Sequence, residues 1–386
     1  MTFIHLSDLH IGKSVNGFSM ITEQKHAFEQ LIGYIKTESP SAVVIAGDVY
    51  DRAIPGAEAV QVFDDFLTEL AGEGLAVLLI SGNHDSPERI NFASRLLSDK
   101  RIYFYGGFDG SIHKVTLPDE YGEVAFWLMP FIKPAMVRGM FAEREEGIES
   151  YDAAVAAALE AADIDYSTRN VLVSHQFYTK SGVTPVRSES ELNPVGGLDA
   201  VNAELIEKFD YAALGHLHGR QGVGSEHIRY CGSPIKYSFS EWRQEKSVTL
   251  VELGEKGNLS VKSLPLTPLH DMREIKGEID KLMSDEIASL ADKEDYLRVV
   301  LTDEEEIIDP VGKLRSVYPN IMSLDFENTR TSIDLSVITA NTEAIEKLSP
   351  YELFSEFYLE VRGSTMSDEQ AVLVRDLLDS ERPVGE

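Results

Sequence analysis

Short apolar runs alternate with segments of helical periodicity over about the first 265 residues, and this alternation constrains the fold more than any other feature. The apolar runs are rich in Val, Ile and Leu, as are strands buried on both faces of a sheet. Between them, apolar residues recur every three or four positions, which is typical of a helix with one buried face. The pattern predicts βαβ units in a layered α/β domain. The predicted strands are Phe3–Leu6, Ala42–Ala46, Ala76–Ser81, Val124–Met129, Val171–Ser174 and Tyr211–Leu214, and the predicted helices are Glu23–Lys36, Ala57–Leu70 and Tyr151–Ala162.

Three more apolar runs follow at the end of this region, and two glycines separate the second run from the third. The runs are His227–Cys231, Ser247–Leu253 and Leu259–Leu264. Glycine is the residue that tight turns between strands most often require. The sequence therefore predicts a meander of three consecutive strands here.

A second unit is predicted to begin near His270. Tyr296–Leu301 has the composition of a strand, and Asp309-Pro310 supplies an N-cap and a proline at the first helical position. The helix is expected to run to about Tyr318, and a strand is expected at Ile321–Phe326. This alternation predicts a small α/β domain.

The last forty or so residues are predicted to be helical. Pro350–Val361 forms one helix, and a capping box at Ser367–Gln370 opens a second at Ala371–Leu378. Leu353, Phe354 and other apolar residues recur at helical spacing in this tail. We therefore expect three domains, with boundaries at 1–268, 269–342 and 343–386.

Charge and composition limit the classes of function. The formal net charge of −30 argues against a protein that binds nucleic acid on its own, because a phosphate backbone is also negative. No apolar run approaches the ~18 residues that a membrane span needs, and the first ten residues lack the basic start of a signal peptide. Cys231 is the only cysteine, so an intramolecular disulfide is excluded. We expect a cytoplasmic protein that makes no contact with a membrane.

Five short polar motifs each follow a predicted strand directly. Functional groups gather at the carboxyl ends of strands in open α/β sheets, so the five segments can converge on one site. Their Asp, Asn and His side chains, with no thiolate among them, suit Mn²⁺, Fe²⁺ or Zn²⁺. The motifs are Asp8-Leu-His10, Gly47-Asp48-Val-Tyr-Asp51, Gly82-Asn83-His84-Asp85, Ser174-His175 and Gly215-His216-Leu-His218.

In this order the five motifs resemble those of the binuclear metallophosphoesterase (calcineurin-like) superfamily. The resemblance implies a layered β-sandwich core flanked by helices, and two divalent ions that clamp a phosphate and activate a water molecule. By resemblance, Asp48 bridges both ions. One ion is then held by Asp8, His10, Asp48 and His218, and the other by Asp48, Asn83, His175 and His216.

The same resemblance gives His84 and Asp85 catalytic roles. His84 is not a ligand in this superfamily, but faces the substrate, where it can stabilise the pentacoordinate phosphorus or protonate the leaving alkoxide. Asp85 is expected to orient His84 through its other ring nitrogen, and a role as a turn residue is the alternative.

Narrower motifs resemble the bacterial exonuclease subunit SbcD. They are Gly47–Arg52 with Pro55, Gly82–Arg89, Gly232–Glu241 (GSPIKYSFSE) and Leu348–Phe354. This resemblance implies a DNA-contacting α/β cap domain and a helical tail that binds an SbcC-type ATPase. It also implies Mn²⁺-dependent degradation of double-stranded DNA from its ends, and endonuclease cleavage of hairpins and single strands. A homodimer within a heterotetramer is implied as well. Archaeal and eukaryotic relatives carry His where this chain has Asp51, so a charge-stabilising role for that position is in doubt.

Two other functions stay open on the sequence alone. One is a metallophosphodiesterase or nucleotidase that acts on small substrates, against which the extra domains and the GSPIKYSFSE segment argue. The other is a metal-binding scaffold that tethers the ATPase at DNA ends, against which the full set of ligands and His84 argue.

Overall fold

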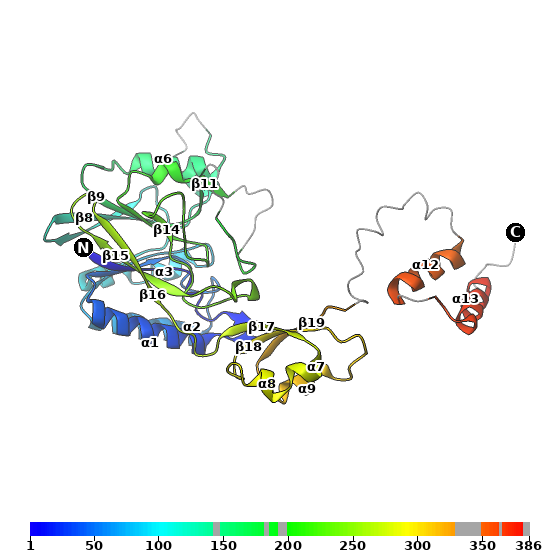
Figure 1. Ribbon diagram of the computed structural model, residues 1–386. Helices are drawn as coiled ribbons and strands as arrows, with labels where there is room; N and C mark the ends of the chain where they lie inside the picture. The colour runs from blue at the N-terminus through cyan, green and yellow to red at the C-terminus, as the bar shows by residue number, and fades with distance from the viewer. Residues whose placement is uncertain (142–146, 181–184, 192–198, 329–348, 363–364, 381–386) are drawn as a thin grey trace. The chain divides into compact units, whose positions relative to one another are not determined.

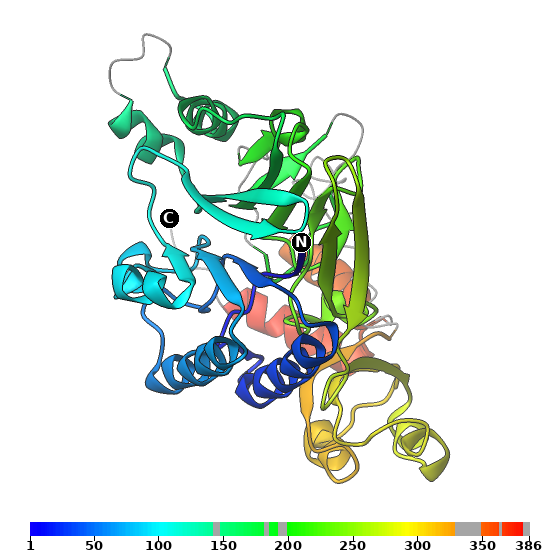
Figure 2. The same ribbon diagram turned by 90° about the vertical axis from the view of Figure 1, so that its left-hand side faces the viewer.

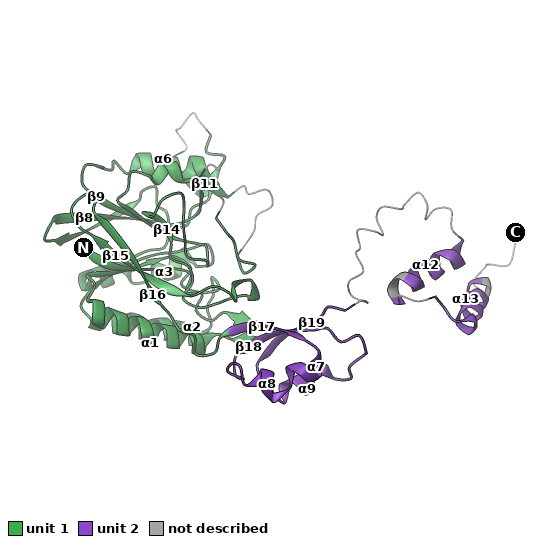
Figure 3. Ribbon diagram, in the orientation of Figure 1, with its two compact units in different colours: residues 1–271 green, residues 272–386 purple. Residues whose placement is uncertain are grey.

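The computed structural model describes residues 1–141, 147–180, 185–191, 199–328, 349–362 and 365–380. It divides into two compact units, Met1–Asp271 and Met272–Glu386 (Figures 1 and 3). No helix in the described part of the chain is both long and apolar enough to cross a membrane. The boundary expected at residues 342 and 343 lies outside the described residues, and the three-domain division stays a prediction.

The first unit is built on two six-stranded sheets that pack face to face (Figure 2). In the first sheet four parallel strands are flanked by an antiparallel hairpin, which pairs with β1. The order of this sheet is β16 (Leu259–Pro265), β15 (Ser247–Leu253), β1 (Thr2–Leu6), β4 (Ala42–Ala46), β5 (Ala76–Ile80) and β6 (Ile102–Tyr105).

The second sheet has a parallel centre, in which β8, β9, β12 and β14 run the same way. Its order is β13 (Gln221–Gly222), β14 (Ile228–Tyr230), β12 (Tyr211–Gly215), β9 (Arg169–His175), β8 (Gly122–Met129) and β7 (His113–Asp119). Side chains from both sheets, such as Phe3, Leu78 and Phe126, form one apolar core between them. This burial explains why the central strands are almost continuously apolar.

Helices cover the outer faces of both sheets. The helices α1 (Ile21–Glu38) and α2 (Ala57–Gly72) lie side by side on the first sheet, where Phe28 stacks on Phe66 with ring centroids 4.4 Å apart (Figure 2). On the second sheet, α6 (Tyr151–Ala161) packs its alanines against Leu172 and Leu214. The remaining short elements are β2 (Ser14–Val15), β3 (Phe18–Ser19), α3 (Pro87–Ile90), α4 (Ser94–Leu97), η1 (Ser98–Lys100), α5 (Pro134–Met140), β10 (Phe177–Thr179), β11 (Ala200–Asn202), η3 (Ala203–Ile206) and η4 (Phe239–Glu241).

The strands and helices predicted for this unit are confirmed, but the predicted meander is wrong. Ser247–Leu253 and Leu259–Pro265 do form an antiparallel hairpin. The run at His227–Cys231 instead supplies β14, which pairs in parallel with β12 in the other sheet. Local composition predicts that these residues form a strand. The sheet that the strand joins depends on the burial of Ile228 and Tyr230 in the core beneath α6. That burial involves residues far away in the sequence, so the local pattern does not predict it.

The second unit contains a three-stranded parallel sheet of β17 (Met272–Gly277), β18 (Tyr296–Leu301) and β19 (Ile321–Phe326). The helices α7 (Ile279–Leu282), α8 (Asp285–Ala288) and α9 (Pro310–Arg315) accompany it. The predicted N-cap is confirmed, because Asp309 accepts a hydrogen bond from the Gly312 amide at 3.0 Å. The helix α9 ends at Arg315, before the expected Tyr318, whose conformation Pro319 restricts.

Two further helices, α12 (Pro350–Arg362) and α13 (Asp368–Ser380), confirm the predicted helical tail. The capping box is also confirmed: the Gln370 amide donates to Ser367 Oγ at 3.3 Å, and the Ser367 amide donates to Gln370 Oε1 at 2.9 Å. The two helices contact each other through a hydrogen bond of 3.1 Å from the Tyr358 hydroxyl to Gln370 Oε1. Apolar side chains of both helices remain exposed, among them Phe357 at 59% and Leu377 at 57%.

Candidate metal centre

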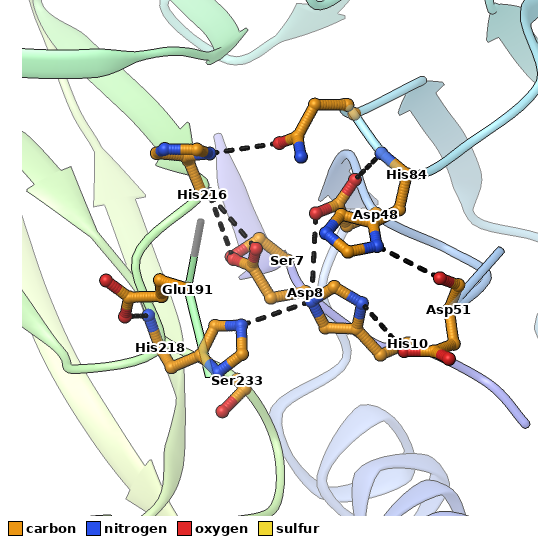
Figure 4. A network of polar contacts seen from close by, with 12 residues as sticks. Ser7, Asp8, His10, Asp48, Asp51, His84, Glu191, His216, His218 and Ser233 are labelled. Carbon is orange, nitrogen blue, oxygen red and sulfur yellow. Dashed lines mark hydrogen bonds and ion pairs between the residues drawn. The ribbon is translucent and has the colours of Figure 1, made fainter. Parts of the chain in front are cut away.

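The five polar motifs come together at one edge of the sandwich. They follow β1, β4 and β5 of the first sheet, and β9 and β12 of the second. These are neighbouring parallel strands in the middle of each sheet, so their carboxyl ends meet. Figure 4 shows side chains from four of these motifs pointing toward one another, namely Asp8, His10, Asp48, His84, His216 and His218. Three overlapping groups of potential metal donors lie there, namely Asp8–His10–His218, His10–Asp48–His84 and Asp8–Asp48–His175, each with its ligand atoms within 4.8 Å of one another.

The backbone of this edge is strained. Asp8, His10 and Asp48 have φ between 41° and 54°, and His216 has φ of 107°, a region that non-glycine residues rarely adopt. Such strain persists where the surrounding structure over-determines it, and it is common at functional sites. The motif that contains Asn83 also requires a glycine at its first position, because a Cβ on Gly82 would lie 2.1 Å from Asp48 Oδ1.

The first donor group consists of Asp8, His10 and His218, all of them buried. The Nε2 atoms of His10 and His218 face each other at 3.1 Å. The carboxylate of Asp8 accepts the backbone N–H of His216 at 3.1 Å, which fixes its direction. Two imidazole nitrogens and a carboxylate thus converge on a small volume from two different sheets.

Asp48 lies between the two sides of the site. Its Oδ2 is 3.3 Å from His175 Nε2 on one side and 3.7 Å from His10 Nε2 on the other. Its Oδ1 accepts the backbone N–H of His84 at 2.9 Å. A carboxylate in this position can serve two cations at once.

Asn83 and His216 complete the second side. The Oδ1 atom of Asn83 lies 3.1 Å from His175 Nε2 and 3.0 Å from His216 Nδ1. The other nitrogen of His175 lies 2.7 Å from the carbonyl oxygen of Ala46. All seven residues predicted as ligands are therefore assembled in one place, although their ligand roles remain a prediction.

Burial and charge make this edge a place that suits cations. Burial, followed by the nearby His175, lowers the pKa of His216 to about 3, and burial lowers the pKa of His10 well below its usual value. Both imidazoles are therefore neutral, as metal ligands must be. Burial would also lower the pKa of His175, but the carboxylate of Asp48 outweighs it and raises that pKa to about 9, so an ion bound beside Asp48 would have to displace a proton from His175.

The types of donor atom at this site are suited to divalent ions. Among the described residues, His10 Nδ1 and His216 Nε2 are buried nitrogens without a hydrogen-bond partner. They are the ring nitrogens on the far side from the other donors, because His10 Nε2 lies 3.1 Å from His218 Nε2 and His216 Nδ1 lies 3.0 Å from Asn83 Oδ1. The nitrogens that would bind an ion are therefore His10 Nε2 and His216 Nδ1. Carboxylate, amide and imidazole donors with no thiolate fit Mn²⁺, Fe²⁺ or Zn²⁺.

His84 lies at the rim of the site and is half-buried. Its Nδ1 lies 2.9 Å from the carbonyl oxygen of Asp51, and its ring meets the ring of His10 edge-on with centroids 4.8 Å apart (Figure 4). His84 also offers a nitrogen within 4.8 Å of donor atoms of His10 and Asp48. Its catalytic role, as opposed to a ligand role, stays a prediction.

The expected hydrogen bond from the His84 ring to the Asp85 carboxylate is a wrong prediction. The carboxylate of Asp85 accepts three backbone N–H groups instead: those of Val49 at 3.1 Å, Tyr50 at 2.9 Å and Gly82 at 2.9 Å. It thereby joins the loop after β4 to the loop after β5. The three amides occupy the Asp85 carboxylate, and the carbonyl of Asp51 takes the place beside His84 Nδ1 that was expected for it.

Sequence reasoning missed a buried group behind His218. Ser190, Glu191, Glu241 and Lys246 surround this histidine through side-chain and backbone hydrogen bonds. Glu241 ends the GSPIKYSFSE segment, so this segment was the available signal. Asp51 was singled out, but its ion pair of 2.8 Å with Lys13 was not predicted.

Two family models match this chain, and similar solved structures are known. Residues 1–220 match the family model of the calcineurin-like phosphoesterases, and residues 268–362 match a model described as the type 5 capsule protein repressor C-terminal domain. A dimetal phosphatase from Danio rerio and the protein TT1561 of Thermus thermophilus are similar solved structures. They have identities of 11% and 13% and TM-scores of 0.40 and 0.39. They match 69% and 68% of this chain, and 97% and 98% of their own.

Curated relatives match nearly the whole length of this chain. The D subunit of nuclease SbcCD from Staphylococcus epidermidis is 30% identical over 381 residues, which is 98% of each chain. Its namesake from Staphylococcus saprophyticus is 30% identical over 382 residues, again 98% of each chain. The chain therefore belongs to the calcineurin-like phosphoesterases, as a metal-dependent phosphodiesterase of the SbcD nuclease family.

Proposed function

We propose that this chain is the nuclease subunit of a DNA-processing complex and cleaves DNA phosphodiester bonds with two Mn²⁺ ions. Double-stranded ends and hairpins are its substrates in DNA repair, recombination and replication, and the cytoplasm is its compartment. The single observation that carries the proposal is the placement of Asp48 between two sets of donors, 3.3 Å from His175 on one side and 3.7 Å from His10 on the other. The name of the curated relatives supports nuclease activity.

In this proposal seven residues hold the ions. Asp8, His10 and His218 serve one ion, Asn83, His175 and His216 serve the other, and Asp48 serves both. When bound, two divalent ions bind the phosphate, lower the pKa of a water molecule and stabilise the leaving oxygen. The chain's own contribution is to fix these donors: the His216 amide holds Asp8, and the carbonyl of Ala46 holds the ring of His175.

His84 is the proposed general acid. The carbonyl oxygen of Asp51 can only accept a hydrogen bond, so Nδ1 of His84 carries a hydrogen. The other nitrogen, Nε2, is then the atom that reaches the leaving oxygen of the DNA strand, and it must carry a hydrogen as well in order to give a proton to that oxygen. Such a group typically contributes about 10²–10⁴-fold to the rate.

The proposed partner is an SbcC-type ATPase, within a heterotetramer that contains two copies of this chain. Its binding site is the tail, where Leu353 and Phe357 of α12 are 44% and 59% exposed. An amphipathic pair of helices is a common docking surface for a partner helix. The net charge of −30 also argues that a partner helps to hold DNA near the site.

The test is an assay of end-labelled duplex and hairpin DNA with the full-length chain and Mn²⁺, with and without the ATPase. We expect Mn²⁺-dependent shortening of the duplex and opening of the hairpin, both stimulated by the partner with ATP. Hydrolysis of a small chromogenic phosphodiester without any cleavage of DNA would instead support a small-substrate enzyme. Binding of the ATPase without hydrolysis of either substrate would support a scaffold.

A further inference from the structure

The proposed mechanism does not use the buried group behind His218. Glu241, at the end of η4, is fully buried, and Lys246 is 8% exposed. The two side chains form an ion pair of 2.7 Å between Lys246 Nζ and Glu241 Oε2. We call Glu241, Lys246 and Ser190 the Glu241 network. A buried ion pair carries a desolvation cost that hydrophobic packing would avoid, so its position next to a metal-facing histidine needs a reason.

The Glu241 network determines which nitrogen of His218 carries the hydrogen. Glu241 Oε1 lies 3.2 Å from His218 Nδ1 and accepts the Ser190 hydroxyl at 2.6 Å. Ser190 Oγ in turn lies 2.9 Å from His218 Nδ1. The carboxylate cannot donate, and the hydroxyl hydrogen is already given to it, so Nδ1 must be the donor. The lone pair is therefore on Nε2, which faces the donor group of Asp8 and His10.

Lys246 holds both the carboxylate and the backbone of the same histidine. Its Nζ donates to Glu241 Oε2 and also to the carbonyl oxygen of His218 at 2.8 Å. Because Lys246 binds Oε2, the other carboxylate oxygen, Oε1, is available to accept a hydrogen bond from the His218 ring. On the other side, Glu191 accepts the backbone N–H of His218 at 2.7 Å (Figure 4). The histidine is thus fixed at its amide, its carbonyl and its ring.

The histidine on the other side of the site is supported differently. His175 Nδ1 faces the carbonyl oxygen of Ala46 at 2.7 Å, a neutral dipole. His218 instead faces the carboxylate of Glu241, whose negative charge Lys246 balances only in part. A carboxylate behind a ligating imidazole raises the basicity of the nitrogen that faces the metal. The two proposed ions should therefore depend on Glu241 to different extents.

We propose that Glu241, held by Lys246, is a positioning residue for His218 and strengthens the binding of the ion held by Asp8, His10 and His218. The other ion does not depend on it. In Glu241→Gln, Lys246 attracts the amide oxygen, so the NH₂ group turns toward His218 Nδ1. That nitrogen loses its charged acceptor and keeps only Ser190 Oγ at 2.9 Å, so the tautomer with its hydrogen on Nε2, the atom that should face the metal, becomes more populated. This inference rests on the ligand sets of the proposed function.

The test is Mn²⁺ binding to the full-length chain, measured by equilibrium dialysis and titration calorimetry, with circular dichroism as the check of folding. The wild type is expected to bind two ions per chain. In Glu241→Gln one ion should bind about 10–100-fold more weakly, the range found when groups behind metal ligands are removed, and the other should bind as before. Glu241→Asp keeps the charge that Lys246 needs but moves it back from the ring, so it should fold and show a smaller loss at the same ion.

Asp119→Asn is the matched control. Asp119 also pairs with a cation, Arg169, at 2.5 Å, but at the starting end of β9, the strand whose other end carries His175. This variant should lose stability and keep both ions. Unchanged binding of both ions in folded Glu241→Gln and Glu241→Asp, or equal weakening of both ions, would overturn the inference. A wild-type chain that binds fewer than two ions would instead count against the binuclear centre of the proposed function.

Discussion

The candidate metal centre and the helical tail differ in the burial of their functional side chains. At the centre, six of the seven proposed ligands are buried, and their directions are fixed by backbone groups such as the His216 amide and the Ala46 carbonyl. In the tail, apolar side chains such as Phe354 and Leu377 are 39% and 57% exposed. All seven proposed ligands thus come from one chain. The tail presents a surface that gains free energy only when something covers it.

The strongest test of this comparison is Asp48→Ala. Removal of the carboxylate between the two donor groups takes a ligand from both proposed ions and leaves their repulsion less compensated. We expect fewer than two Mn²⁺ per chain by metal analysis and a loss of hydrolysis beyond the ~10⁴-fold limit of a general acid. Asp65→Ala, an exposed carboxylate on α2, is the control and should change neither. Two tightly bound ions in Asp48→Ala would contradict the bridging role.

His84→Ala separates metal binding from chemistry within the centre. We expect both ions to remain while hydrolysis falls about 10²–10⁴-fold, because His84 acts on the leaving oxygen. Metal analysis and a single-turnover nuclease assay on the same preparation measure the two effects. If metal and activity are lost together, His84 is a ligand, a role that its distance to His10 and Asp48 also permits.

Truncation after Glu343 tests the other half of the comparison. The shortened chain should remain a folded, Mn²⁺-dependent nuclease on simple substrates but should no longer co-purify with the ATPase. Phe357→Asp is the milder version, and we expect it to weaken ATPase binding about 30-fold, as loss of a central aromatic contact does. Glu356→Gln, on the same helix, is its control. Insolubility of the truncated chain, or undiminished binding, would show that the tail belongs to the fold.

The smallest expected effect concerns the end of the sandwich opposite to the metal centre. Hydrogen bonds from Arg169, and then from the N-terminal amine, outweigh burial and hold the pKa of Asp119 well below its usual range. A lowered carboxyl pKa adds stability above the unfolded value of about 3.9, and this stability is lost as pH falls through the folded value. The side chain is only partly shielded from water, so Asp119→Asn should cost about 1 kcal/mol, or about 2–4 °C in Tm at pH 7. Thermal melts should show this difference shrinking below about pH 4, and a difference independent of pH would contradict an electrostatic origin of the stabilisation.

What the sequence could predict follows from the range of the interactions involved. Each strand and the motif after it lie within about ten residues, so composition and spacing located Asp8, Asp48 and the other motif residues. The partner of Asp85 could not be predicted, because three amides from two loops compete for its carboxylate. Glu241 was missed because its contact with His218 joins residues that are 23 positions apart in the sequence, and no spacing rule predicts such a contact.

The two sheets contribute to both halves of the proposed binuclear site. Asp8 and His10 follow a strand of the first sheet and His218 follows one of the second, while Asn83 and His175 are divided in the same way. Each bound ion would therefore act as a cross-link between the layers, in a chain whose single cysteine excludes a disulfide. An ion present at 100 times its Kd would add about 2.7 kcal/mol to the free energy of unfolding. Removal of the ions by a chelator should then lower the free energy of unfolding of the whole sandwich. In a cell short of the metal, the folded protein would have a shorter lifetime.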